Sequence, residues 1–188
     1  MEAIRTENLT KRYKDVTAVD ELNLEIGRGE LFSLLGVNGA GKTTTMRMLS
    51  TLLVPTSGEI RYDDLLTVGN ELAIKQRIGF LTNEIRLDGQ FTPNQSADYF
   101  GQLYGMTKAQ IEANKKDLFD YFGITEFANR KYETFSTGMK QKTSIAICLI
   151  HDPDIIIFDE PSAALTEAEI EEMFKIIRDL RVGRISVL

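Results

Sequence analysis

The sequence has little cysteine, no long hydrophobic run and no excess of positive charge. Its single cysteine, Cys148, excludes an intramolecular disulfide framework and is ordinary for a reducing compartment. No window approaches the roughly 18 consecutive apolar residues that span a bilayer, and the N-terminus has no apolar signal segment. The net charge of -6 argues against non-specific nucleic-acid binding, which requires a basic face. We therefore expect a cytoplasmic protein that binds no nucleic acid.

Segments typical of strands alternate with segments typical of helices along the 188 residues. The strand-like segments are 4–9, 22–26, 31–35, 59–62, 78–81, 155–158 and 185–188. The helix-like segments are 43–53, 92–122 with a break near Gly105, 139–150 and 166–182. Ile155–Phe158 is apolar at every position, which is typical of a central strand in a parallel sheet. The alternation predicts an α/β fold in one domain, with an inserted helical subdomain at about 92–134.

A phosphate-binding loop is predicted where the segment 31–35 meets the following helix. Gly36–Thr43 fits G-x-x-x-x-G-K-[ST], in which glycines let backbone N–H groups converge on phosphate oxygens. Lys42 is expected to reach the β- and γ-phosphates, Thr43 to hold Mg²⁺ and Thr44 to bond an earlier phosphate. The residues expected to bind the nucleotide phosphates are Gly36, Asn38, Gly39, Ala40, Gly41, Lys42, Thr43 and Thr44.

Two acids, Asp159 and Glu160, directly follow the apolar segment 155–158. Ligands of open α/β sheets bind at the carboxyl ends of strands, so these carboxylates are placed for phosphoryl transfer. We expect Asp159 to orient Mg²⁺ and Glu160 to act as the base that positions or deprotonates the attacking water.

A second anion-binding surface is possible at the start of the helix that follows Phe135. Ser136 is a good N-cap residue, and Ser136, Gly138 and the helix N-terminus can bind an anion together. From the residues alone, an ordinary capped helix is the simpler interpretation.

Together and in this order, these segments resemble the nucleotide-binding domain of ABC ATPases over essentially the whole chain. Phe135–Gln141 resembles the family signature. The resemblance implies a P-loop NTPase core of the ABC type, with an N-terminal antiparallel β region and an inserted α-helical subdomain. It also implies a homodimer with ATP at the interface, in which Ser136 and Gly138 of one domain cap the γ-phosphate held by the other. Tyr13 matches the aromatic residue that stacks on adenine.

The segments 52–60 and 99–105 look most like the branch that serves ABC-2-type exporters, which includes sodium and drug efflux systems. This implies a subunit that uses MgATP to power export through a separate membrane-spanning permease, from a peripheral position on the inner face of the membrane. The permease contact is expected at about 92–134 and near Asn83. Two alternatives remain: a soluble ABC ATPase of translation or DNA repair, and a non-hydrolysing ATP-binding regulator.

Several positions depart from the family pattern. Asn83 stands where the family has the glutamine that reaches Mg²⁺ and the attacking water, and Thr137 stands where glycine is commoner. Thr166 replaces an aspartate, and the only histidine, His151, does not match the switch position. Because the chain stops at Leu188, we expect a truncated ATPase that lacks the C-terminal part of the usual domain. Such a chain is expected to bind ATP but to hydrolyse it weakly or not at all.

Overall fold

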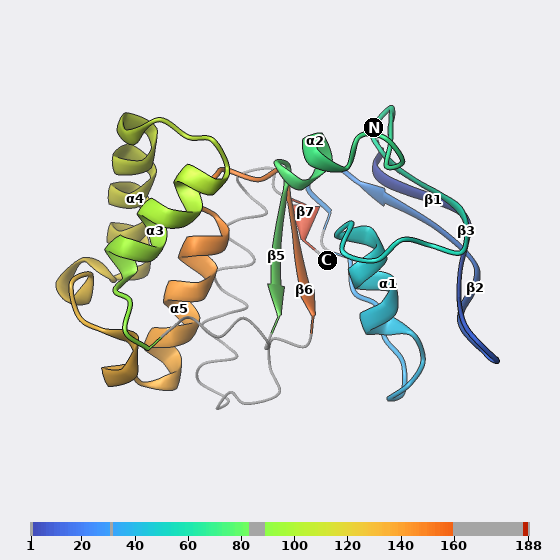
Figure 1. The fold of residues 1–188 in the computed structure, drawn as a ribbon, viewed down its shortest axis with the longest axis horizontal. Helices are drawn as coiled ribbons and strands as arrows, with labels where there is room; N and C mark the ends of the chain where they lie inside the picture. The colour runs from blue at the N-terminus through green and yellow to red at the C-terminus, as the bar shows by residue number, and fades with distance from the viewer. Residues whose placement is uncertain (1, 31, 83–88, 160–185, 188) are drawn as a thin grey trace. The chain divides into compact units, whose positions relative to one another are not determined.

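The computed structural model describes residues 2–30, 32–82, 89–159 and 186–187 (Figure 1). These residues form two compact units. The first contains residues 2–80, 154–159 and 186–187, and the second contains 81–82 and 89–153.

An antiparallel sheet opens the first unit, as the family resemblance implies. It contains β1 (Glu2–Tyr13), β2 (Val16–Gly27), β3 (Ser57–Tyr62) and β4 (Leu65–Leu66), in the order β2-β1-β3-β4. The predicted strands 4–9 and 22–26 are correct in place but too short. Positive φ angles at Asn8 (49°) and Glu21 (44°) accompany register shifts between β1 and β2, and these irregularities interrupt the alternation of apolar and polar residues.

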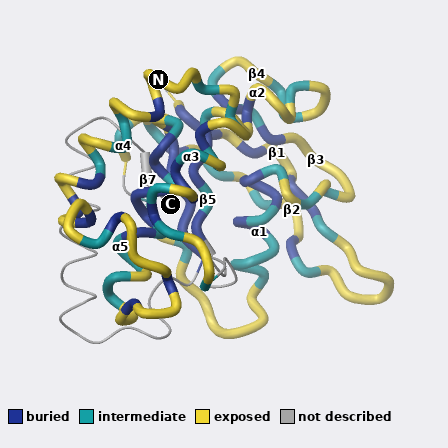
Figure 2. Tube along the Cα trace, turned by 60° about the vertical axis from the view of Figure 1, so that its left-hand side comes forward, coloured by how far each residue is buried: buried dark blue, intermediate teal, exposed yellow. Residues whose placement is uncertain are grey.

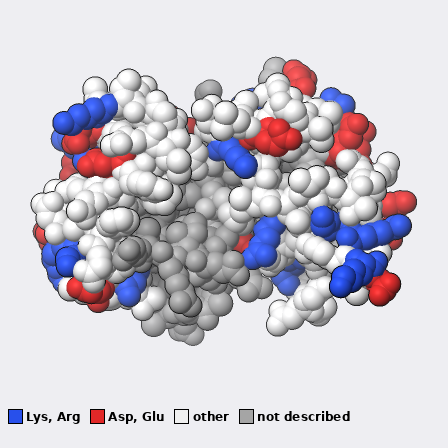
Figure 3. All heavy atoms as spheres, viewed as in Figure 1, with Lys and Arg blue, Asp and Glu red and all other residues white. Residues whose placement is uncertain are grey.

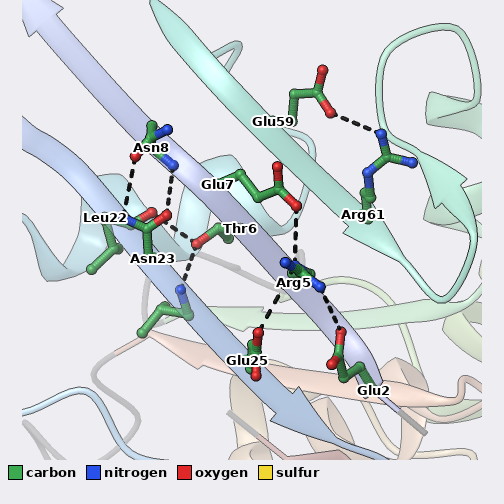
Figure 4. Close-up of polar contacts among 11 residues, drawn as sticks. Glu2, Arg5, Thr6, Glu7, Asn8, Leu22, Asn23, Glu25, Glu59 and Arg61 are labelled. Atoms are coloured by element: carbon green, nitrogen blue, oxygen red, sulfur yellow. Dashed lines mark hydrogen bonds and ion pairs between the residues drawn. The ribbon is translucent and has the colours of Figure 1, made fainter.

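Polar side chains bond across the irregular part of the β1–β2 ladder (Figure 4). The Thr6 hydroxyl donates to the carbonyl of Leu22 and accepts from the N–H of Leu24, both at 2.9 Å. The Asn23 side chain accepts from the N–H of Asn8 at 2.9 Å. These bonds satisfy backbone groups that a regular ladder would pair, so the two long strands stay joined through the bulges.

Ion pairs on the exposed face of this sheet are local. Arg5 lies 3.1 Å from Glu7, and Arg61 lies 3.0 Å from Glu59, as the close-up shows (Figure 4). On the molecular face drawn in Figure 3, the two signs of charge are interspersed over the described residues. Pairs as exposed as these add little to stability, since solvent screens them.

A more enclosed ion-pair network joins three turns of the first unit. Arg77 contacts Asp63 at 2.6 Å and Asp154 at 2.7 Å, and Arg28 contacts Asp63 at 2.5 Å. Asp154 directly precedes β6 (Ile155–Asp159), and the N–H of Ile155 donates to the carbonyl of Arg77. The network therefore fixes the start of the strand whose far end carries Asp159.

The hydrophobic core of the first unit lies around the helix α1 (Lys42–Leu49) (Figure 2). Met46 and Met48 are buried with Ile4 and Leu9 of β1 and Ile157 of β6. Their burial shows that the two methionines serve packing. The helix is shorter than the predicted 43–53.

A second sheet contains β5 (Ile78–Thr82), β6 (Ile155–Asp159) and β7 (Ser186–Val187), in that order. β6 pairs in parallel with β7, and every residue of β6 is buried. The central position predicted for 155–158 is thus confirmed, and the strand predicted at 185–188 is confirmed over its two described residues, 186–187. The short helix α2 (Glu71–Lys75) leads into this sheet.

The strand predicted at 31–35 is wrong over residues 32–35, and Leu31 lies outside the described residues. Phe32 and Leu34 are partly buried against the core, while Ser33 and Leu35 are exposed. The sequence itself is a short apolar run, which is why it predicts a strand there. Neither sheet of the described residues includes the segment, however, and an extended segment becomes a strand only through a ladder.

The second unit is helical, with α3 (Pro93–Leu103), α4 (Lys108–Phe122), α5 (Thr137–Cys148) and the 3-10 turns η1 (Thr125–Phe127) and η2 (Tyr132–Thr134). Thr92 and Thr107 form capping boxes at α3 and α4, and the predicted break falls at Gly105, with φ of 76°. None of the helices in the described part of the chain is long and apolar enough to cross a membrane. The helix predicted at 166–182, with Thr166 at its start, lies outside the described residues.

The only cysteine of the sequence, Cys148, is the last residue of α5, and the only histidine, His151, follows three residues later. Cys148 is partly buried, and burial raises the pKa of its thiol to about 12, which makes it a packing residue and a poor nucleophile. The His151 ring stacks on Tyr104, with centroids 3.7 Å apart and planes 3° from parallel. His151 is therefore a helix-end residue, as its place in the sequence predicts.

Tyr62 connects the sheet to the C-terminal end of α1. Its side chain is fully buried, and its hydroxyl donates a hydrogen bond to the carbonyl of Leu49. We predict that Tyr62→Phe lowers the free energy of unfolding by about 1–3 kcal/mol, because the buried carbonyl loses its partner. Urea denaturation followed by circular dichroism measures the change. Tyr99→Phe, at an exposed position, is the control; an equal effect of both variants would contradict the prediction.

The same burial predicts a pH dependence at high pH. Burial raises the pKa of Tyr62 above its ordinary value, so above pH 10 the unfolded chain releases a proton that the folded chain retains. The free energy of unfolding should then fall with rising pH, by about 1.4 kcal/mol per pH unit for this group. Urea titrations between pH 9 and 11 should show a shallower fall for Tyr62→Phe than for the wild type. Parallel curves would show that Tyr62 does not contribute.

Candidate nucleotide-binding site

The phosphate loop turns sharply before it enters α1. Gly39 and Gly41 have φ angles of 83° and 85°, in the left-handed region that favours glycine. The N–H of Ala40 donates to the carbonyl of Val37 at 3.1 Å, and the N–H of Thr45 donates to that of Gly41 at 2.8 Å. The loop therefore delivers the chain directly into the first turn of the helix.

Gly41 packs against the backbone of β2. A Cβ atom at Gly41 would lie 2.2 Å from the carbonyl oxygen of Ala18 and 3.2 Å from a methyl group of Val19. Only a glycine fits this contact, and it joins the phosphate loop to the β1–β2 hairpin. The motif in the sequence predicts the glycine, but it does not reveal Ala18 as the reason.

Lys42 lies back across the loop that precedes it. Its Nζ donates to the carbonyls of Gly36 at 2.8 Å and Val37 at 3.0 Å. The ammonium is thereby held at the N-terminus of α1, whose first turn contains no acidic residue. A lysine at a helix N-terminus favours an anion there.

Thr43 and Asp159, which are both predicted to act on Mg²⁺, lie in direct contact. The Thr43 hydroxyl donates to a carboxylate oxygen of Asp159 at 3.0 Å, and Asp159 is buried at the carboxyl end of β6. A hydroxyl and a carboxylate are oxygen donors of the kind that Mg²⁺ prefers, so the pair fits this ion. Among the described residues there is no cluster of three or more His, Cys, Asp or Glu that could hold a metal. A site with few protein carboxylates suits Mg²⁺, which commonly shares its coordination with substrate phosphates.

Two predicted members of the site, Asn83 and Glu160, lie outside the described residues. Thr44 lies in the first turn of α1 and is partly buried. The structure thus brings together the loop, Lys42, Thr43 and Asp159, all of which belong to the first unit.

Tyr13 ends β1 and pairs with Val16, and its side chain is 46% exposed. The ring is therefore half exposed at the end of a strand that runs beyond the predicted 4–9. The hairpin that carries Tyr13 includes Ala18, against which Gly41 packs. The aromatic ring and the phosphate loop therefore belong to connected parts of one unit. The Nζ of Lys11 lies 5.3 Å from the centroid of the Tyr13 ring. This contact was not predicted from the sequence, although two residues spaced by two on a strand lie on the same face.

The signature segment opens α5 in the second unit. Ser136 is the N-cap, and its hydroxyl accepts from the N–H of Met139 at 3.2 Å. Ser136 and Thr137 are exposed, and Gly138 is partly buried. Phe135 is buried and packs edge-to-face on Phe127 and Tyr132. The cap is confirmed, while the anion-binding role of Ser136 and Gly138 stays a prediction.

Comparison with known proteins agrees with this arrangement. Residues 19–163 match the ABC transporter family. The chain is 45% identical over 161 residues to the ABC transporter ATP-binding protein NatA of Bacillus subtilis (strain 168), covering 83% of this chain and 65% of NatA. It is 34% identical to the linearmycin resistance ATP-binding protein LnrL of the same organism, covering 98% of this chain and 60% of LnrL. The chain thus spans less than two thirds of either relative.

Solved structures share the fold. An ATP-binding cassette of an ABC transporter in its ADP conformation superposes with a TM-score of 0.89 at 20% identity, covering 100% of this chain and 80% of that one. A dimeric cassette bound to ADP and Pi gives a TM-score of 0.84 at 27% identity, covering 98% and 85%. These likenesses confirm the predicted α/β core of the ABC type. With its phosphate loop, Asp159 and Ser136 all inside the matched region, the chain belongs to the ABC transporter family.

Proposed function

We propose that the chain is the ATP-binding subunit of an ABC exporter, which binds MgATP, dimerises, and drives export through a separate membrane subunit. The observation that carries the proposal is the hydrogen bond between Thr43 and Asp159 beside the phosphate loop. It joins two segments 116 residues apart at the place where a nucleotide phosphate and its Mg²⁺ need oxygen ligands.

Each residue of the described site has a defined task in this proposal. Lys42 bonds the β- and γ-phosphates from the N-terminus of α1, and Thr44 bonds an earlier phosphate. Thr43 and Asp159 hold Mg²⁺, which neutralises charge on the phosphates when it is bound. Tyr13 stacks on adenine at the hairpin end.

The hydrolytic step is assigned to residues next to this core. Glu160 follows Asp159 in the sequence, and it positions or deprotonates the attacking water. Asn83 follows β5 and takes the place of the family glutamine, with one methylene less reach toward the water and Mg²⁺. The weak turnover expected from the sequence stays a prediction.

The proposal assigns a partner to each of two surfaces. Ser136 and Gly138 at the start of α5 cap the γ-phosphate on a second ATPase domain, which is most simply a second copy of this chain. The helical stretch 92–134 contacts a membrane-spanning permease, and the subunit works peripherally on the cytoplasmic face. The Nod factor export ATP-binding protein I of Ralstonia nicotianae, which is 34% identical over 162 residues, supports an export role. The names of LnrL and of the daunorubicin resistance ATP-binding protein DrrA3 of Streptomyces coeruleorubidus, which is 33% identical, point to drug resistance and agree with that role.

Lys42→Ala tests the nucleotide site. We expect the dissociation constant for MgATP to rise about 10- to 100-fold, because a charge-assisted hydrogen bond to phosphate is lost. Isothermal titration calorimetry measures this constant. Lys108→Ala removes the same charge from an exposed position at the start of α4 and serves as the control. Unchanged affinity in Lys42→Ala, with a native circular dichroism spectrum, would exclude the proposed phosphate site.

Ser136→Asp tests the signature surface. Aspartate preserves the N-cap, since it is among the best capping residues, but it places a negative charge where the γ-phosphate of the partner is expected. The experiment uses a Glu160→Gln background, which removes the carboxylate assigned to the attacking water. With MgATP, sedimentation velocity should show dimers for the protein that retains Ser136 and monomers for Ser136→Asp. The control is Thr107→Asp, the same kind of change at the N-cap of α4. Dimers that persist in Ser136→Asp would remove this surface from the interface.

A further inference from the structure

A lysine lies directly over the exposed tyrosine at the hairpin end. Lys11 and Tyr13 are two residues apart on β1, and the Lys11 Nζ is 5.3 Å from the centroid of the Tyr13 ring. This distance is within the range of a cation–π interaction. The contact leaves the ring well exposed, with 46% of Tyr13 accessible.

The ammonium of Lys11 is held in place by the segment that follows α1. Its Nζ donates to the carbonyl of Val54 at 2.7 Å. Two further bonds fasten the same segment to β1: Thr56 N–H to the carbonyl of Thr10 at 2.8 Å, and Arg12 N–H to the Thr56 hydroxyl at 3.0 Å. A surface lysine usually samples many rotamers, but here a backbone carbonyl and an aromatic face both constrain the side chain.

The segment also has a fixed relation to the phosphate helix. The N–H groups of Leu52 and Leu53 both donate to the carbonyl of Arg47 in the last turn of α1, at 2.9 and 3.0 Å. Lys11 therefore bonds to a stretch anchored on α1 while it contacts the ring at the end of β1.

We propose that Lys11 is a positioning residue for the nucleotide base, an inference that rests on the proposed stacking of adenine on Tyr13. Lys11 fixes the orientation of the ring. A cation over one face also draws the π electrons of the ring toward itself, which makes the opposite face a better partner for an electron-rich purine. Lys11 thus strengthens recognition of the base without contacting the phosphates.

The test compares two ligands that differ in the base. MgATP carries adenine, whereas inorganic triphosphate with Mg²⁺ offers only the phosphates. Lys11→Met removes the charge and keeps the side-chain length. We expect its dissociation constant for MgATP to rise about 3- to 10-fold and its constant for triphosphate to stay unchanged. Lys14→Met, which removes an exposed lysine in the adjacent turn, is the matched control and should alter neither constant.

A spectroscopic readout separates ring positioning from a general loss of structure. The chain contains no tryptophan, so Tyr13→Trp introduces a single indole at the ring position. MgATP should quench its fluorescence, and adding Lys11→Met should weaken this quenching at saturating nucleotide. Lys11→Arg should restore it, because guanidinium groups also bind over aromatic faces.

Three outcomes are decisive. If Lys11→Met raises the dissociation constants for MgATP and triphosphate equally, Lys11 acts on the phosphates and the inference is overturned. If Tyr13→Ala raises only the dissociation constant for MgATP while Lys11→Met changes neither constant, the base site stands and the inference about Lys11 fails. If Tyr13→Ala itself leaves both constants unchanged, stacking on Tyr13 fails, and with it the premise of the inference.

Discussion

Thr43 and Asp159 hold together the two parts of the chain on which the site depends. Thr43 is in the first turn of α1, and Asp159 is the last residue of β6, so their 3.0 Å hydrogen bond sets a helix N-terminus beside the carboxyl end of a buried strand. The surrounding apolar core, which includes Met48 and Ile157, keeps both elements in place. Because Asp159 is buried, its carboxylate depends on partners such as this hydroxyl.

Features that depend on local signals could be predicted from the sequence. The glycines of the phosphate loop, the serine cap at Ser136 and the break at Gly105 each follow from the conformation or hydrogen bonding of a few neighbouring residues. The buried strand Ile155–Asp159 also follows, since its unbroken apolar run has few other uses in an α/β fold. Local chemistry therefore predicted the turn of the phosphate loop, the cap at Ser136 and the buried strand, whereas the roles of the side chains in nucleotide binding stay predictions.

Features that depend on distant partners could not be predicted. The bulges at Asn8 and Glu21 hide the true length of β1 and β2, because they shift the alternation by which strands are recognised. Residues 32–35 belong to a short apolar run of the kind that predicts a strand, but they lack a ladder. In the site, the contact of Gly41 with Ala18 arises from tertiary packing, which leaves no periodic trace in the sequence. The alternation along β1 places Lys11 and Tyr13 on one face, but the bond from Lys11 to Val54 depends on a distant segment.

The close packing of Gly41 on Ala18 has a consequence for ligand size. It leaves no room for the phosphate loop to approach the hairpin further, and the hairpin carries the aromatic ring at its tip. The distance between the Tyr13 ring and the phosphate loop is therefore fixed by the fold. On the proposed roles of the ring and the loop, a ligand whose base and phosphates are separated by a shorter or longer linker can contact one of them but not both.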